Sequence, residues 1–209
     1  MELIVEEITR VRGRVRTRFD NGEEIWLTPA GAAELGLREG DAIGAEALEQ
    51  FVLLRQYPPA LNRAVALLAR RACSRGEIEE KLRAARYAPA VVEMVLYKLE
   101  REKLLNDRDF ADQWVRYRSG GKYGSHRIAQ ELRRKGVAED VVEDAMENIS
   151  EEDQLGEAIA WLRRRYRPEE DPAARRKADQ KTLQALVRRG FSWDIAKEAL
   201  DSVKEEPVR

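Results

Sequence analysis

The stretch Ser74–Leu82, SRGEIEEKL, occurs again farther along the chain, and this repetition indicates how the chain folds. Gly124–Leu132, GSHRIAQEL, aligns with it without a gap at an offset of 50 residues. A weaker third copy covers Leu186–Leu200. Self-similarity at such a period is typical of stacked helical units, each of which is too small to bury its apolar face alone.

Apolar residues recur at helical spacing around each copy, so each unit is expected to hold three short helices. Ser74 and Glu77 form the S-x-x-E pattern of a capping box, and Asp171-Pro172 pairs a cap residue with proline at a first helical position. Gly136 and Gly190 stand where a left-handed helix end is expected. The sequence therefore predicts a mainly α protein with three tandem three-helix-bundle repeats in an elongated array.

The residues before the repeats predict a small module that contains a β-hairpin. Leu3–Leu27 has strand patterns, including one strand over Val11–Phe19, and Asp20–Glu23 predicts a turn because Asn-Gly accepts positive φ easily. Thr28-Pro29 predicts the start of a short helix. We expect Pro58-Pro59 to end the module, which should bury a small core of its own. The expected domains are a hairpin module at 1–57 and helical repeats at 58–106, 107–152 and 153–209.

Composition narrows the class of protein. Charged residues make up 37% of the 209 residues, yet the formal net charge is only −1, and the basic residues are 29 arginines and nine lysines. Arginine suits bidentate contact with phosphate or carboxylate, although composition bias also accounts for its excess. The single cysteine excludes an internal disulfide and fits a reducing compartment. Without a signal-peptide pattern or a membrane-length apolar run, the expectation is a soluble cytoplasmic protein. We separately expect a monomer.

Charge is sorted along the helical part of the chain. The segment Arg116–Lys135 carries seven basic residues and one acid, Glu131, whereas Glu139–Glu157 carries nine acids and no Lys or Arg. Basic residues return at Arg163–Arg165. A solvated helical surface accounts for each run singly. The alternation of runs favours basic faces that meet an anionic or mixed-charge partner.

The basic runs supply the candidate binding residues for a partner or for DNA. The loop Gly120–Gly124 places Tyr123 among arginines, and arginine beside an exposed aromatic is a composition used for single-stranded nucleic acid. A turn whose tyrosine packs on its own bundle is the equally open alternative. The candidates are Arg116, Arg118, Lys122, Tyr123, Arg127, Arg133, Arg134, Lys135, Arg163, Arg164 and Arg165.

No pattern in the sequence predicts catalysis. The chain has no phosphate-binding glycine motif, and one His with one Cys cannot form a His/Cys metal site. His126 alone has no marked nucleophile or orienting acid. We therefore expect no catalytic residues, no metal site and no cofactor. Two short, closely joined helices in each unit also fit a helix-turn-helix, although three-helix bundles share that outline without binding DNA.

Three stretches of the helical region form a recognisable series: Ala66–Arg71 with Ser74, Glu77 and Leu82; Leu104–Ala111; and Tyr123-Gly124 with Ile128, Leu132 and Lys135–Val137. In these residues and their spacing the helical region resembles the RecX family, the regulatory proteins that modulate the bacterial recombinase RecA. The resemblance covers about Leu61–Val203, and two departures stand at glycine positions of the family, Arg86 and Lys103.

The resemblance implies tandem three-helix repeats that bind along the RecA–DNA filament. It implies restraint of ATP hydrolysis, strand exchange and filament growth in recombination and SOS repair, without catalysis or a cofactor. A second hypothesis is a helical protein that binds single- or double-stranded DNA directly, without dependence on RecA. A structural scaffold is the third. Stronger DNA binding in the presence of RecA and ATP would distinguish the first hypothesis from the second.

Overall fold

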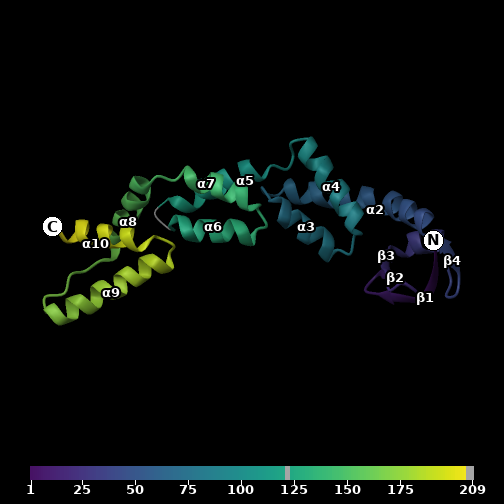
Figure 1. Cartoon of the computed structure of the whole chain (residues 1–209), viewed down its shortest axis with the longest axis horizontal. Coiled ribbons are helices and arrows are strands. Elements are labelled where there is room, and N and C mark those ends of the chain that lie inside the picture. Colours follow the sequence, from purple (N-terminus) through teal and green to yellow (C-terminus); the bar gives the residue numbers. More distant parts are fainter. Residues whose placement is uncertain (121–122, 206–209) are drawn as a thin grey trace. The chain divides into compact units, whose positions relative to one another are not determined.

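The computed structural model describes residues 1–120 and 123–205, and the chain divides into two compact units, Met1–Leu105 and Asn106–Arg209 (Figure 1). The first unit contains β1 (Glu2–Val11), β2 (Arg14–Phe19), β3 (Glu24–Leu27), α1 (Pro29–Leu35), β4 (Ala42–Gly44), α2 (Ala45–Leu68), α3 (Arg75–Ala84) and α4 (Pro89–Arg101). The second contains α5 (Asp107–Ser119), α6 (Ser125–Arg134), α7 (Glu139–Glu147), α8 (Glu151–Arg165), α9 (Pro172–Arg188) and α10 (Trp193–Glu205).

The four strands form one antiparallel sheet in the order β3-β2-β1-β4. The turn predicted after Phe19 is present, and the Phe19 N–H donates to the Glu23 carbonyl at 3.0 Å. The prediction of one strand over Val11–Phe19 is wrong, because β1 ends at Val11 and a second turn follows. Arg12 and Gly13 adopt φ of 46° and 80° there, which matches the positive φ values of a tight hairpin turn.

The two prolines do not end the N-terminal module, contrary to expectation, because α2 runs through Pro58 and Pro59. Proline removes a donor and leaves the carbonyl four residues earlier without its helical partner. Those carbonyls belong to Leu54 and Arg55 on an exposed part of the helix, where the Leu54 residue is 65% exposed. Water can therefore satisfy them, and the helix continues into the first repeat.

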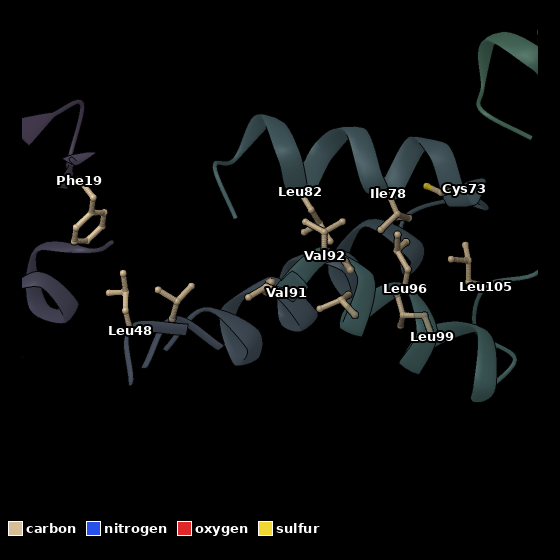
Figure 2. Packing of buried hydrophobic residues seen from close by; sticks show 14 of the residues in the cluster. Phe19, Leu48, Cys73, Ile78, Leu82, Val91, Val92, Leu96, Leu99 and Leu105 are labelled. Atoms are coloured by element: carbon tan, nitrogen blue, oxygen red, sulfur yellow. The ribbon is translucent and has the colours of Figure 1, made fainter. Parts of the chain in front are cut away.

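A shared core joins the sheet to the first helical repeat. One cluster of buried residues contains Phe19 from β2, Leu48 from α2 and Ile78, Leu96 and Leu99 from α3 and α4 (Figure 2). The expectation that the strand module has a separate core is therefore wrong. Helix α2 belongs to both parts, since its first half covers the sheet and its second half packs on α3 and α4.

Gln56 ties the two parts together by hydrogen bonds. It is only 4% exposed. Its Nε2 donates to the Trp26 carbonyl at 2.9 Å, and its Oε1 accepts from the Ala88 N–H at 2.7 Å. One side chain of α2 therefore satisfies a backbone acceptor of the sheet and a backbone donor at the start of α4, as buried polar groups require.

Sequence signals account for the helix ends of the first repeat. Ser74 and Glu77 form the predicted capping box at α3, and Pro89 occupies the first turn of α4. Arg86 and Lys103, which stand at glycine positions of the resembling family, adopt φ of 62° and 57°. Both turns thus keep a left-handed conformation that glycine adopts more easily than arginine or lysine does.

The second unit contains two further three-helix arrangements, each with its own buried cluster. Phe110, Ile128, Leu132 and Val142 belong to the cluster of α5, α6 and α7, and a second cluster joins α8, α9 and α10. Gly136 and Gly190 end α6 and α9 with φ of 73° and 92°, as predicted. Within residues 1–120 and 123–205, no helix is long and apolar enough to cross a membrane.

Gln56→Ala should destabilise the first unit by about 1–3 kcal/mol, because it leaves the partly buried Trp26 carbonyl and Ala88 N–H without their partner. Gln50→Ala is the matched control, since Gln50 is an exposed glutamine on the same helix. Urea denaturation gives the stability, and NMR hydrogen exchange at the Ala88 amide reports the lost bond. Equal stability of the two variants, with slow exchange at Ala88 in both, would contradict this role of Gln56.

Candidate functional site

Most of the predicted binding residues lie on three helices of the second unit. Arg116 and Arg118 belong to α5; Arg127, Arg133 and Arg134 belong to α6; Lys135 is its C-cap residue; and Arg163, Arg164 and Arg165 form the last turn of α8. Tyr123 lies in the link before α6. Lys122 was also predicted and lies outside the described residues.

Glu131 is the centre of the site. Its carboxylate accepts two hydrogen bonds from Arg118, of which the one from Nε to Oε2 measures 2.6 Å. It also accepts from Arg127 Nε at 3.3 Å and from Trp114 Nε1 at 3.2 Å. The Glu131 side chain is 15% exposed and that of Arg118 is 20% exposed. This single acid of the basic segment is therefore an interior partner that orients two arginines and a tryptophan.

The surroundings of Glu131 favour its ionised form. Burial of the carboxyl group opposes ionisation, but the hydrogen bonds and charge of Arg118, together with Arg127 and Trp114, outweigh burial and lower the pKa of Glu131. The hydrogen bond to Glu131 correspondingly raises the pKa of Arg118 against the effect of burial. Both groups are charged at neutral pH, so one of the cations of the site is neutralised internally.

Cations and aromatic rings alternate outward from this centre. Lys135 Nζ lies 4.2 Å from the Trp114 ring centroid, and the Cζ of Arg118 lies 5.4 Å from Trp114 and 4.3 Å from Tyr123. The series continues through Arg189, whose Cζ is 5.8 Å from Tyr123 and 4.8 Å from Trp161. We call the following series the cation–aromatic ladder: Lys135, Trp114, Arg118, Tyr123, Arg189, Trp161 and Arg165.

The ladder limits what Tyr123 can bind. Its ring already contacts the guanidinium groups of Arg118 and Arg127, at 4.3 and 4.6 Å, and its side chain is only partly exposed. Each such contact contributes about 0.5–1 kcal/mol at exposed sites. A nucleic-acid base would have to displace these arginines before it could stack on Tyr123. The arrangement therefore suits contact with an anionic surface better than it suits base stacking.

The remaining predicted cations differ in how far they are engaged. Arg133 pairs with Glu139 through Nε at 2.8 Å on an exposed surface. Arg116, Arg134 and Arg164 are exposed and form no ion pair with other described residues. These three cations can therefore meet an external anion without breaking an ion pair.

A close backbone contact joins the second and third repeats beside the site. A Cβ added at Gly124 would lie 2.4 Å from the Gly190 carbonyl oxygen and 2.4 Å from the Phe191 nitrogen. A Cβ added at Gly190 would lie 2.4 Å from the Cβ and the backbone nitrogen of Arg127. Glycine is required at both positions because any side chain would separate the two backbones.

The same contact caps α6. The His126 N–H donates to the Gly190 carbonyl at 3.1 Å, and the Ser125 N–H donates to Gln154 Oε1 at 3.1 Å. The N-cap residue Gly124 has no side chain to perform this task. In the first repeat the aligned residue is Ser74, which caps its own helix. The third repeat therefore supplies the acceptors for the first N–H groups of α6, whereas the first repeat caps α3 with its own side chains.

Sequence reasoning found part of this site and missed the rest. Trp114, Glu131, Trp161 and Arg189 were not predicted as site residues, although Glu131 was visible as the one acid in a basic segment. The offset alignment places Lys81 of the first repeat opposite Glu131. The carboxylate centre is thus specific to the second repeat rather than a product of repetition.

The chemistry of the site is that of recognition. It presents fixed guanidinium and ammonium groups with aromatic supports, which suit phosphate or carboxylate partners. Among residues 1–120 and 123–205, no group of three His, Cys, Asp or Glu side chains could hold a metal ion. His126 is exposed beside the junction, and its backbone N–H takes part in the capping of α6.

Comparison with known families identifies all three helical repeats. Residues 60–99 match the description "RecX, first three-helix domain", residues 106–146 match the second three-helix domain, and residues 151–200 match the third. Regulatory protein RecX of Corynebacterium efficiens is 39% identical over 154 residues, which cover 69% of this chain and 73% of the relative. The RecX of Halorhodospira halophila is 40% identical over 146 residues, covering 70% of this chain and 89% of the relative.

Two solved structures share the fold. A crystal structure of regulatory protein RecX superposes with a TM-score of 0.61 at 24% identity and covers 98% of this chain and 100% of its own. The crystal structure of RecX from Lactobacillus salivarius gives 0.62 at 24% identity, covering 71% of this chain and 96% of its own. At this identity the likeness concerns the fold alone.

Glu131→Gln should lower the stability of the second unit at neutral pH by about 1–2 kcal/mol, because it removes a charge-assisted partner of Arg118. The pKa of Glu131 is lowered below its ordinary value of 4.5 in the folded state. Its contribution is therefore present above about pH 4.5 and is lost as the pH falls through the folded pKa. Urea denaturation at a series of pH values measures the difference, with the exposed Glu147→Gln as control. This account would be excluded if the difference in free energy of unfolding between the wild type and Glu131→Gln stayed constant from pH 7 to pH 3.

Gly124→Ala should destabilise the second unit by about 1–3 kcal/mol, because the added methyl group overlaps the backbone of Gly190 and Phe191. Gly156→Ala provides the matched control, since Gly156 lies inside α8 and a Cβ there meets nothing within 4 Å. The control should be neutral or stabilising by about 0.5–1 kcal/mol. Thermal denaturation measures both, and two variants of equal stability would show that the junction tolerates a side chain.

Proposed function

The chain belongs to the RecX family of regulatory proteins, and we propose that it binds the RecA–DNA filament and restrains its ATP hydrolysis, strand exchange and growth. The observation that supports this proposal most strongly is the match of all three helical repeats, in order, to the three RecX domains. Relatives that cover most of this chain are named regulatory proteins. We further propose that the chain acts by binding alone, as a cytoplasmic monomer without catalysis.

We propose that the cation–aromatic ladder and the exposed arginines near it form the surface that meets the filament. A filament of protein on DNA presents phosphates and acidic side chains, and both recognise guanidinium groups. Arg116, Arg134 and Arg164 are the proposed direct contacts, because they are exposed and form no ion pair with other described residues. Arg118 has the different role of holding Glu131 and Tyr123 in place.

Direct binding to DNA without RecA remains the second candidate. The exposed arginines favour it as much as they favour the filament, because phosphate contact needs only accessible cations. The engaged ring of Tyr123 disfavours a mode in which bases stack on that residue. The two functions differ in whether RecA and ATP strengthen binding to the same oligonucleotide.

The test measures the DNA-dependent ATPase activity of RecA as this protein is added, using the wild type and an Arg116→Glu/Arg134→Glu/Arg164→Glu variant. The wild type should inhibit the activity, and the variant should need at least about tenfold more protein, because three cation–anion contacts become repulsive. Lys197→Glu is the control, since Lys197 is an exposed cation of α10 outside the site. Circular dichroism establishes that each variant is folded.

The outcomes separate the two hypotheses. Inhibition by the wild type and the control, with loss in the triple variant, supports the proposed function and its surface. The second hypothesis would be favoured if RecA turnover stays unchanged at saturating wild-type protein and oligonucleotide binding is equal with and without RecA and ATP. The binding partner would then be DNA itself and not the RecA–DNA filament. Undiminished inhibition by the triple variant would move the binding surface elsewhere on the chain.

A further inference from the structure

A cleft of about 720 Å³ lies between α6, α7 and the end of α9 in the second unit. Ala129 and Val142 lie beneath its surface and are buried, so its accessible apolar surface comes from Met146, which is partly exposed, and from Val187, which is 42% exposed. Gly190 also lines the cleft, and its carbonyl accepts from the His126 N–H at the start of α6. The cleft is large enough to receive a bulky apolar side chain and the backbone on either side of it.

The rim of the cleft is basic. Arg127 and Arg133 of α6 and Arg188 of α9 line it, whereas Glu143 is the one acidic residue of the lining. Polar donors and acceptors are added by Gln130 and Gln154. The combination of apolar surface with a cationic rim is unlike the acidic surface of the neighbouring helices α7 and α8, which carry all nine acids of Glu139–Glu157.

The cations of the rim are available to an external carboxylate. Arg188 is exposed and forms no ion pair with other described residues. Arg133 does pair with Glu139, but both side chains are about half exposed, and an exposed pair contributes little and exchanges easily. Arg127 already contacts Glu131 and Tyr123. It therefore contributes mainly positive electrostatic potential to the cleft and not a free hydrogen-bond donor.

We propose that this cleft docks an acidic peptide segment of a partner protein, with one apolar side chain of the peptide on Met146 and Val187 and its carboxylates on Arg188 and Arg133. Charge complementarity selects the occupant, because the lining carries three arginines and one glutamate, and Arg188 forms no ion pair with other described residues. The apolar surface favours a peptide over nucleic acid, since a phosphate backbone offers nothing to cover Met146 and Val187. Methionine adapts to different apolar partners. This inference does not depend on the proposed function.

The test uses the full chain and a fluorescent peptide of about ten residues, rich in glutamate with a central pair of leucines, and follows fluorescence anisotropy. Arg188→Glu should weaken binding at least about tenfold, because a rim contact becomes repulsive. Arg176→Glu is the matched control on the same helix, since Arg176 is exposed and does not line the cleft. The control should bind within about twofold of the wild type.

Three companion probes make the outcomes decisive. The proposal expects weak binding of a peptide with lysine in place of glutamate, and of a peptide with alanine in place of leucine. It also expects that oligothymidylate does not displace the acidic peptide. Equal binding of the acidic and basic peptides would overturn the proposal, as would equal loss in the Arg188 and Arg176 variants. The proposal would also be overturned if oligothymidylate displaced the acidic peptide and Arg188→Glu weakened oligothymidylate binding to the same degree. The cleft would then be a nucleic-acid-binding surface.

Discussion

The second unit depends on the approach of two glycine backbones, Gly124 before α6 and Gly190 after α9. The approach lets the third repeat cap α6 through the Gly190 carbonyl and Gln154. It also places Arg189 between Tyr123 and Trp161, which joins the aromatic residues of two repeats into one ladder. Both the candidate filament surface and the cleft between α6, α7 and α9 follow from this contact, because each needs residues from either side of it.

Electrostatics then divides the arginines of this region into two roles. Arg118 and Arg127 serve the interior carboxylate of Glu131, so they organise the surface rather than bind from it. The exposed arginines, such as Arg116 and Arg188, are accessible to anionic groups of other molecules. A near-zero net charge is therefore compatible with strong local recognition, because the acids that balance these cations lie mainly on a different segment of the chain.

Local signals predicted much of the fold. The capping box at Ser74, the proline at the start of α4 and the left-handed glycines at 136 and 190 each act over a few residues, and each is present. The prediction that Pro58 and Pro59 end the N-terminal module failed for a physical reason. The effect of a proline inside a helix depends on whether the carbonyls that it leaves unpaired can reach water, and their exposure is a property of the folded surface. The site was predicted as basic residues, but Arg189 and Trp161 join it only through a contact across the repeats that no local pattern reveals.

The most direct test of this account is amide hydrogen exchange of Ser125 and His126, followed by NMR in the wild type and in Gly190→Ala. Both amides should exchange slowly in the wild type, since Gln154 and Gly190 accept their hydrogen bonds. Both should exchange much faster in the variant, because its added methyl group would overlap Arg127, while Glu77 at the self-capped start of α3 stays protected. Fast exchange of Ser125 and His126 in the wild type would contradict the capping of α6 by the third repeat.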